Sequence, residues 1–263
     1  MSGIRQQDNF SAWLAEAARD VGAHSVACVR MDNPDLKRQI EKKHLQVADW
    51  LMLGMHGEMA YLERMLAEKA NPWEVFPFAK SVIVITFRNR WGDPSVTHPF
   101  PAPAPDALLG YISAYARDVD YHVTGQAILA ELKQQLGGEI HAEATVDTAA
   151  VDERLFATVG RLGVIGTNHL LRVPDGGDTR VFIGCLFVDI ELPEVIHPIQ
   201  MPFSCPSCSA CVKNCPTGAI QPDQPLDARK CISYLTIEKR SLLSFDEGRS
   251  IGSWLFGCDD SET

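Results

Sequence analysis

The sequence predicts an α/β or α+β body followed by a small ferredoxin-like iron–sulfur domain. Hydrophobic residues make up 46% of the 263 residues, which is enough for a large core without disulfides. Short apolar strands alternate with helical patterns along most of the chain, as in layered folds of helices and sheet. Six of the eight cysteines lie in the last quarter, and such a dense group favours a metal site over a disulfide scaffold. We therefore predict two domains, residues 1–195 and residues 196–263.

The body is predicted to begin with a helix and a strand. Apolar residues recur at helical spacing until Gly22, which ends the helix, and residues 24–29 are typical of a strand. Residues 35–70 have a helical pattern, and residues 80–87 (KSVIVITF) are typical of a buried strand. The apolar residues of the first helix are Phe10, Trp13, Leu14, Ala17, Ala18 and Val21.

The rest of the body continues this alternation. Five prolines within residues 93–106 predict an extended loop, and a helical pattern follows over residues 107–136. Residues 140–146 alternate between apolar and polar, which predicts a strand. A helix over roughly residues 150–162 and a strand over roughly 181–190 complete the body. The linker before the cysteines is marked by Pro193, Pro198 and Pro202.

Charge and hydropathy narrow the classes of function. The net charge is −10, and an acidic surface repels a phosphate backbone at long range, so general affinity for nucleic acids is not expected. The longest apolar runs are only as long as a strand, which excludes a membrane span. The first twenty residues lack the pattern of a secretion signal. We therefore expect a cytoplasmic protein without a membrane partner.

The run Cys205-x2-Cys208-x2-Cys211-x3-Cys215-Pro has the spacing of bacterial ferredoxins. Three thiolates at this spacing wrap one face of an iron–sulfur cubane, and the fourth binds the other cluster in proteins that hold two. Zinc is the alternative, but paired cysteines of zinc sites normally lie a dozen or more residues apart. The run therefore favours iron–sulfur chemistry.

This domain has too few cysteines to supply the ligands of two complete clusters. Two clusters need eight thiolates, and the region supplies only two more cysteines, Cys231 and Cys258. Ser261 stands where a second Cys-x2-Cys pair would place its second cysteine. We expect either two incomplete sites or one cluster completed by another kind of ligand.

Other strings of residues are spread over nearly the whole chain, and two are specific. These are residues 226–238 (LDARKCISYLTIE) and residues 257–260 (GCDD). The others are His56–Met59, Tyr115–Arg117, Asp120–His122, Asp147–Ala149, Glu153 with Arg154, and Gly163 with Gly166 and Asn168. Together with the cysteine run, they resemble the epoxyqueuosine reductase family, the cobalamin and iron–sulfur enzymes that complete queuosine in tRNA.

The resemblance implies a nitroreductase-like body that binds cobalamin base-off, and a ferredoxin-like domain with two 4Fe–4S clusters. An external donor would pass electrons through the clusters to cobalt, and the epoxide oxygen of epoxyqueuosine in the tRNA anticodon loop would be removed. The resemblance assigns protonation of this oxygen to Asp147, whose carboxyl we expect burial to keep protonated. It assigns cluster ligation to Cys205, Cys208, Cys211, Cys215, Cys231 and Cys258. It assigns cofactor binding to Arg64, Asn168, Ser233, Asp259 and Asp260.

The chain also departs from the family, which leaves other readings open. Val164 and Thr167 stand where the family usually has Trp and Lys, and we expect this chain to lack the helical-repeat domain that binds tRNA in the family. A truncated member, a shortened paralogue without the tRNA reaction, and a ferredoxin-like electron carrier therefore remain alternatives. Asp147 is alternatively the cap of the next helix. The basic group Arg229, Lys230, Lys239 and Arg240 is either a contact for RNA or for an acidic electron donor, or a solvated face.

Overall fold

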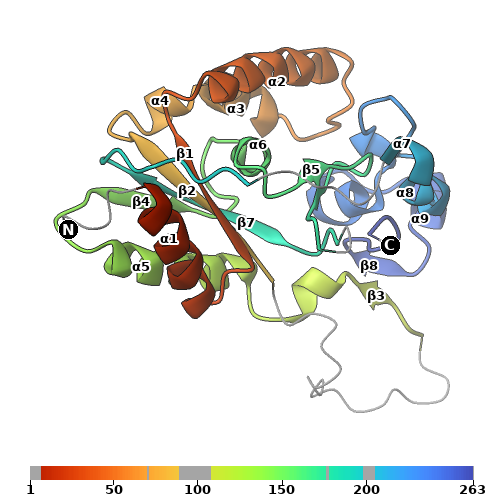
Figure 1. Cartoon of the computed structure of the whole chain (residues 1–263). Coiled ribbons are helices and arrows are strands. Elements are labelled where there is room, and N and C mark those ends of the chain that lie inside the picture. Colours follow the sequence, from red (N-terminus) through yellow and green to blue (C-terminus); the bar gives the residue numbers. More distant parts are fainter. Residues whose placement is uncertain (1–6, 70, 89–107, 176–177, 198–204, 263) are drawn as a thin grey trace.

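The computed structural model describes residues 7–69, 71–88, 108–175, 178–197 and 205–262. A four-stranded sheet lies at the centre of the body, in the order β1-β2-β7-β4 (Figure 1). All three pairs of neighbouring strands are antiparallel. The body is therefore an α+β arrangement rather than a doubly wound parallel sheet. The strands are β1 (Ser25–Arg30), β2 (Ser81–Phe87), β7 (Phe182–Val188) and β4 (Ala142–Thr145).

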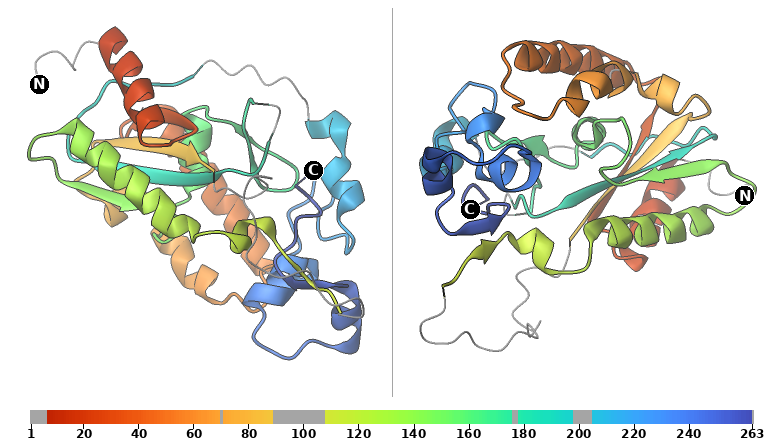
Figure 2. Two further views of the ribbon diagram at one scale, coloured as in Figure 1. Left: turned by 90° about the horizontal axis from the view of Figure 1, so that it is seen from below. Right: turned by 180° about the vertical axis from the view of Figure 1, so that it is seen from behind.

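Helices cover both faces of this sheet. Helices α1 (Gln7–Asp20) and α5 (Tyr121–Leu136) lie on one face, and α2 (Pro34–Met52) and α6 (Glu153–Val159) lie on the other (Figure 2). Because the central strand β2 has a helical layer on each side, all of its residues are buried. The predicted strands over 24–29, 80–87, 140–146 and 181–190 are confirmed as β1, β2, β4 and β7.

Alternate side chains of β2 face opposite sides of the sheet and therefore pack into two separate hydrophobic cores. Ile83, Ile85 and Phe87 pack with α1 and α5, whereas Val82 and Val84 pack with α2 and α6. The polar side chains of β2 are buried with hydrogen-bond partners, as buried polar groups require. The Ser81 hydroxyl accepts from the Leu192 amide at 2.9 Å, and the Thr86 and Ser25 hydroxyls lie 2.5 Å apart.

The helix predicted over residues 35–70 is interrupted. Helix α2 ends at Met52, and α3 (Tyr61–Lys69) begins after a series of turns, followed by the short α4 (Pro72–Val75). Gly54 and Gly57 in these turns both have φ of +63°, a left-handed conformation that glycine adopts without steric cost. The prediction missed this break because apolar residues recur on both sides of it at helical spacing.

The helix predicted over residues 107–136 is wrong in its first part. The described residues before Tyr121 form the short strand β3 (Tyr111–Ile112) and a 3₁₀ turn over residues 114–117. Helix α5 starts only at Tyr121, where the Asp120 side chain accepts from the His122 amide at 2.9 Å and caps the helix. The prolines of residues 93–106 and two of the linker prolines, Pro198 and Pro202, lie outside the described residues.

The cysteine-rich region consists of short elements that lie at one end of the sheet (Figure 1). These are α7 (Cys205–Cys208), α8 (Ala210–Asn214), a 3₁₀ turn over residues 228–230, a π-helical turn over 234–238, α9 (Phe245–Ser250) and β8 (Trp254–Phe256). Strand β8 pairs in parallel with β3, and the Trp50 indole N–H donates to the Leu226 carbonyl at 2.6 Å. The body and this region are therefore joined by backbone pairing as well as by side chains. Among the described helices, none is both long and apolar enough to cross a membrane.

Candidate functional site

A cavity of about 1200 Å³ lies between the body and the cysteine-rich region. Its walls come from α2 and α6, from the segment after β4, and from the loop between the short strands β5 (Val164–Ile165) and β6 (Leu171–Arg172). Residues 220, 223–226, 231, 233, 258, 261 and 262 form the wall on the cysteine-rich side. The volume exceeds the roughly 300–1,000 Å³ that is typical of pockets for drug-sized ligands. The cavity is therefore large enough for a bulky cofactor or for part of a macromolecule.

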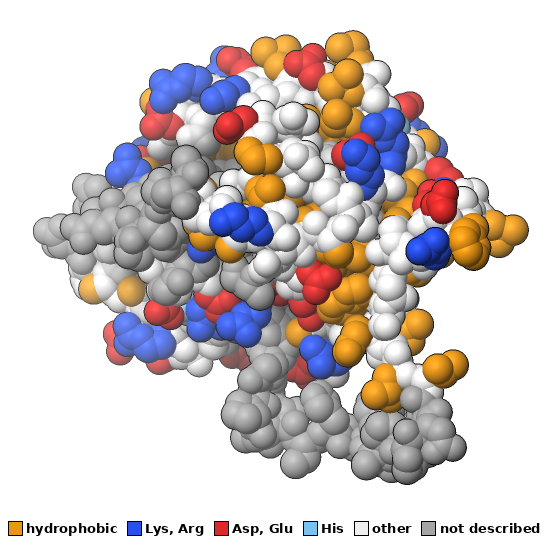
Figure 3. Space-filling view, turned by 90° about the vertical axis from the view of Figure 1, so that its right-hand side faces the viewer, with side chains coloured by type: hydrophobic (Ala, Val, Ile, Leu, Met, Phe, Trp, Pro, Cys, Tyr) orange, Lys and Arg blue, Asp and Glu red, His pale blue; other side chains and the backbone are white. Residues whose placement is uncertain are grey.

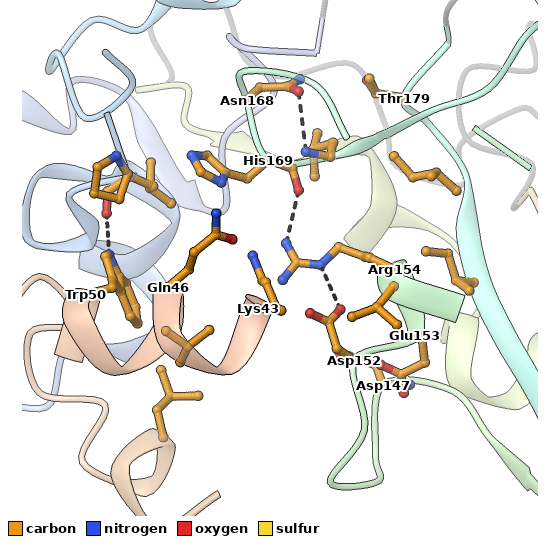
Figure 4. A pocket seen from close by; sticks show the side chains of 18 of the residues that line it. Lys43, Gln46, Trp50, Asp147, Asp152, Glu153, Arg154, Asn168, His169 and Thr179 are labelled. Atoms are coloured by element: carbon orange, nitrogen blue, oxygen red, sulfur yellow. Dashed lines mark hydrogen bonds and ion pairs between the residues drawn. The ribbon is translucent and has the colours of Figure 1, made fainter. Parts of the chain in front are cut away.

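Asp147 lies on the body side of the cavity (Figure 4). It follows β4 in a left-handed conformation with φ of +55°, and Glu153 Oε1 accepts from its amide at 3.1 Å. The Tyr121 hydroxyl donates to Asp147 Oδ2 at 2.8 Å. The side chain of Asp147 is exposed, so the burial that we expected from the sequence is not observed. Asp147 is also not the cap of the next helix, because the residue before α6 is Asp152.

Tyr121 is a rigid partner for this carboxylate. Its ring stacks on Phe182 with centroids 4.2 Å apart and planes 2° from parallel. Burial and the neighbouring Asp147 raise the pKa of Tyr121, so the phenol stays protonated and donates its hydrogen bond at any physiological pH. The sequence placed Tyr121 in a helix, but only the tertiary structure shows which carboxylate it contacts.

Basic side chains line another part of the wall (Figure 4). Arg154 donates to the His169 carbonyl at 3.0 Å and pairs with Asp152 at 3.4 Å. Burial, and then Arg154, lower the pKa of Lys43. Burial, Arg154 and Lys43 lower the pKa of His169 to about 4, so His169 is neutral at pH 7. The His44 Nδ1 atom is buried and has no hydrogen-bond partner among the described residues.

The first three cysteines of the ferredoxin run lie on two short helices. Cys205 and Cys208 are in α7, and Cys211 is in α8. Between them, Ser209 has a left-handed φ of +51°, which turns the chain from one helix to the next. Cys208 is exposed, whereas Cys211 is buried.

The other three cysteines meet at a second, small cavity. Cys215, Cys231 and Cys258 all line it, although up to 43 positions separate them in the sequence, and Ser261 and Asp260 line it as well. Cys231 and Cys258 also line the large cavity, so the two cavities share part of their walls. Within the described segments, no three His, Cys, Asp or Glu side chains converge closely enough for a single metal ion. The ligands of a cubane stand farther apart than those of one ion, so this result bears on mononuclear sites.

Two of the residues predicted to bind cofactor, Asn168 and Ser233, line the large cavity. Asn168 is only 7% exposed, donates to the Ser261 carbonyl at 2.9 Å and accepts from the Leu170 amide at 3.3 Å. Ser233 lines both cavities. The cofactor roles of both residues stay predictions.

The remaining three residues predicted to bind cofactor do not line the large cavity. Asp259 accepts from the Ser113 hydroxyl and from the Ala114 amide at 2.9 Å, which ties the chain around β3 to the segment after β8. Asp260 accepts from the Trp254 indole at 3.1 Å and lines only the small cavity. Arg64 is exposed on α3 and lines neither cavity. Their assignments also stay predictions.

Most of the basic residues singled out in the sequence form ion pairs with neighbouring acidic side chains. Arg229 pairs with Asp227 at 2.8 Å, and Lys230 lies 3.7 Å from the same carboxylate. Lys239 pairs with Glu58 at 3.4 Å and with Glu247 at 3.2 Å. On the face of the cysteine-rich region, acidic, basic and hydrophobic side chains are interspersed (Figure 3). This arrangement is typical of a solvated surface.

Sequence reasoning missed several residues of the large cavity. Lys43, Val47 and Trp50 recur at helical spacing on α2, which is the only signal that one face of this helix is special. Glu262 also lines the cavity, and burial together with Asp259 raises its pKa to about 7. No pattern around Glu262 predicts its burial, because that depends on contacts with distant segments.

Two family models match the chain. Residues 69–148 match "Epoxyqueuosine reductase QueG, DUF1730", and residues 204–261 match a 4Fe-4S double cluster binding domain. The second match includes the six cysteines described above. Residues 204–261 are therefore an iron–sulfur domain.

Curated relatives are epoxyqueuosine reductases. The protein from Pseudomonas aeruginosa is 34% identical over 262 residues, which cover 97% of this chain and 70% of the relative. The protein from Shewanella oneidensis is 37% identical over 221 residues, which cover 81% of this chain and 54% of the relative. The chain thus spans between about half and about two thirds of the length of most of the curated relatives that it matches.

Solved structures show the same fold. Epoxyqueuosine reductase from Streptococcus thermophilus has a TM-score of 0.73 at 23% identity, covering 97% of this chain and 65% of that one. An epoxyqueuosine reductase solved with a tRNA-Tyr epoxyqueuosine-modified stem loop has a TM-score of 0.72 at 24% identity, covering 98% of this chain and 64% of that one. At these identities the likeness concerns the fold.

Proposed function

Because the chain belongs to the epoxyqueuosine reductase family, we propose that it reduces epoxyqueuosine in tRNA to queuosine with cobalamin and 4Fe–4S clusters. One observation carries the proposal. The large cavity has the proposed acid, Asp147, on one wall and two proposed cluster ligands, Cys231 and Cys258, on another. A cofactor in this cavity would therefore lie between the source of electrons and the source of a proton.

The donor set fits iron–sulfur clusters. Cysteine thiolates are the ligands that these clusters require, and the spacing of the first run is that of bacterial ferredoxins. We assign Cys205, Cys208 and Cys211 to one cluster. We assign Cys215, Cys231 and Cys258, which share the small cavity, to the other.

The large cavity also fits a cofactor of the size of cobalamin. Its volume is above the usual range for small ligands, and Lys43, Gln46 and Arg154 supply hydrogen-bond donors around it. The buried His44 Nδ1 atom has no partner among the described residues, and a polar group of a bound ligand would satisfy it. Bound cobalamin would supply electron transfer at its metal, which is chemistry that side chains cannot provide.

The side chains of this chain would orient the substrate and move a proton. Removal of an epoxide oxygen as water, leaving a carbon–carbon double bond, consumes two electrons and two protons. In this proposal Asp147 delivers a proton to the departing oxygen, and the hydrogen bond that the Tyr121 hydroxyl donates to Asp147 Oδ2 at 2.8 Å supports this role by orienting the carboxyl group. A bound cofactor and substrate would cover the exposed Asp147 and exclude water from it.

Four further features are part of this proposal. We place the division between the domains near residue 195, and we describe the body as nitroreductase-like. We expect an external electron donor. We also expect a cytoplasmic setting, where cysteines are kept reduced for metal binding.

Since the net charge is −10, recognition of the tRNA anticodon loop is expected to depend on shape and on a few local contacts rather than on general attraction.

The proposal is tested by anaerobic turnover. The chain is reconstituted with iron, sulfide and cobalamin, and is then given a reductant and epoxyqueuosine-containing tRNA. We expect queuosine, detected by mass spectrometry of the digested tRNA, and a large loss of product with Asp147→Asn. If no queuosine forms while a full-length relative is active, the proposed reaction is wrong for this chain. An unchanged cobalamin spectrum on mixing would instead favour the electron carrier.

A further inference from the structure

The cavity of the second cluster contains a hydroxyl where a fourth thiolate would be expected. Cys215, Cys231 and Cys258 line it from three segments, and Ser261 lines it from the segment after β8. Ser261 follows Cys258 at the spacing of a Cys-x2-Cys pair. The sequence position and the tertiary position therefore point to the same role for this serine.

Ser261 is held in place through its backbone. Its carbonyl accepts from Asn168 Nδ2 at 2.9 Å, and Asn168 is itself buried. The amide of the next residue, Glu262, donates to the Asp259 carbonyl at 3.0 Å, which closes a turn around Ser261. The Ser261 hydroxyl makes no hydrogen bond within the described part of the chain. The backbone is thus anchored while the side-chain oxygen is available to a ligand.

Three other oxygen-bearing side chains line the same cavity, but they fit less well. The Thr217 hydroxyl lies only two residues after Cys215 and is already within hydrogen-bond distance of the Cys215 sulfur, at 3.8 Å. The Asp260 carboxylate already accepts from the Trp254 indole at 3.1 Å and from the Cys258 thiol at 3.5 Å. Ser233 lies two residues after Cys231, which is not the Cys-x2-Cys spacing. Ser261 alone combines that spacing with an unengaged oxygen.

We propose that Ser261 Oγ is the fourth ligand of the second 4Fe–4S cluster, completing a site of three thiolates and one oxygen. The inference rests on the proposed assignment of Cys215, Cys231 and Cys258 to this cluster. Ligation would release the hydroxyl proton to solvent, so that an alkoxide binds iron without any change in oxidation state. An alkoxide is a harder donor than a thiolate and stabilises ferric iron. The second cluster is therefore expected to have a lower reduction potential than its all-thiolate counterpart.

The test compares full-length variants in which the first cluster is removed by Cys205→Ala with Cys208→Ala. After anaerobic reconstitution with iron-57, Mössbauer and EPR spectra report on the second cluster alone. With Ser261 present, we expect a four-iron cluster in which one iron differs from the rest. Ser261→Ala should convert it to the three-iron form. Ser261→Cys should make the four irons alike and raise the reduction potential.

Two controls separate this inference from its alternatives. Ser253→Ala removes an exposed hydroxyl near β8 and should leave the spectra unchanged, and Asp260→Asn tests the competing carboxylate. If Ser261→Ala keeps the spectrum of the parent, or if the parent is already a three-iron cluster, Ser261 is not a ligand. If even Ser261→Cys forms no cluster, the assignment of the three cysteines fails instead.

Discussion

At the scale of single residues, the pairing of Tyr121 with Asp147 decides how the proposed acid is presented. Asp147 leaves β4 in a left-handed conformation, which projects it from the end of the strand. One carboxylate oxygen accepts a hydrogen bond from the half-buried Tyr121 phenol, and the Asp147 amide donates to Glu153. An exposed carboxylate with one fixed oxygen keeps its other oxygen available for a substrate.

Tyr121→Phe is predicted to reduce turnover while leaving the fold intact. The variant removes the hydrogen bond to Asp147 but keeps the ring that stacks on Phe182. Loss of one hydrogen bond to a charged group is worth about 1.5–3 kcal/mol, so we expect kcat to fall roughly 10- to 100-fold. Steady-state kinetics and a pH–rate profile measure this effect. The same change at the exposed Tyr111 is the control, and equal kinetics in both variants would argue against a positioning role for Tyr121.

The stability of the fold is predicted to depend on the ionisation of Glu58. Its carboxylate accepts from the Arg240 and Ser241 amides, each at 2.9 Å, and from the Ser241 hydroxyl. These hydrogen bonds, that of the hydroxyl first, lower the pKa of Glu58 from 4.5 to about 2. Because the pKa is lower in the folded state, the stabilisation is complete above about pH 4.5 and is lost as the pH falls toward 2.

Glu58→Gln tests this dependence. We expect a difference in Tm between the parent and the variant that is constant at neutral pH and shrinks as the pH falls through 4. Thermal unfolding at intervals from pH 7 to pH 3 measures it, with the exposed Glu139→Gln as the matched control. A difference that does not change with pH would show that the hydrogen bonds of Glu58 do not depend on its charge.

At the scale of elements, the turns between α2 and α3 connect the body to the cysteine-rich region. The Tyr234 hydroxyl accepts from the Glu58 amide at 2.8 Å, and Gly57 lies directly against the Tyr234 ring. A Cβ atom on Gly57 would be 2.4 Å from the Tyr234 hydroxyl oxygen. Gly54 has the same φ of +63° but has open space around it.

This pair of glycines allows a matched prediction. Gly54→Ala should destabilise the protein by about 1–2 kcal/mol, the cost of a left-handed conformation for a residue with a Cβ atom. Gly57→Ala should cost about 1–3 kcal/mol more, because Tyr234 must also move. Urea unfolding followed by circular dichroism measures both values. Equal losses in the two variants would mean that contact with Tyr234 does not restrict Gly57.

At the scale of the whole molecule, the proposed function depends on how the iron–sulfur domain sits against the body. The contacts between them come from several places: the pairing of β3 with β8, the bond from Trp50 to Leu226, and the bond from Asn168 to Ser261. Asn168 is buried in the body and holds the segment that carries Cys258. The proposed site of the second cluster therefore has all its ligands in the iron–sulfur domain, but one of its segments is held by the body.

Asn168→Ala is predicted to weaken the second cluster. The variant leaves the Ser261 carbonyl without its partner, a loss of about 1–3 kcal/mol, and frees the segment around Cys258. We expect iron to be released several-fold faster under a chelator, as followed by the loss of visible absorbance. Asn71→Ala, in a residue that lines neither cavity, should release iron at the parental rate. Equal rates in both variants would mean that Asn168 does not support the cluster.

Local patterns carried much of the fold. Strands β1, β2, β4 and β7 were predictable because each is a short run with its own periodicity and a buried face. The start of α5 and the break after α2 were not, since a capping aspartate and two glycines with positive φ decide them. The pairing of β3 with β8 was also unpredictable, because two- and three-residue strands have no period to detect.

By itself, the sequence determined the iron–sulfur character of the last quarter of the chain, because four of its six cysteines have the spacing of the ferredoxin run. Such features are set by neighbours along the chain, so they can be read locally. Only the tertiary structure decided that Asp147, Cys231 and Cys258 line one cavity, and that Ser261 joins three cysteines at another. These arrangements depend on packing between segments that are distant in the sequence, such as those of Asn168 and Ser261. No local sequence pattern encodes such packing.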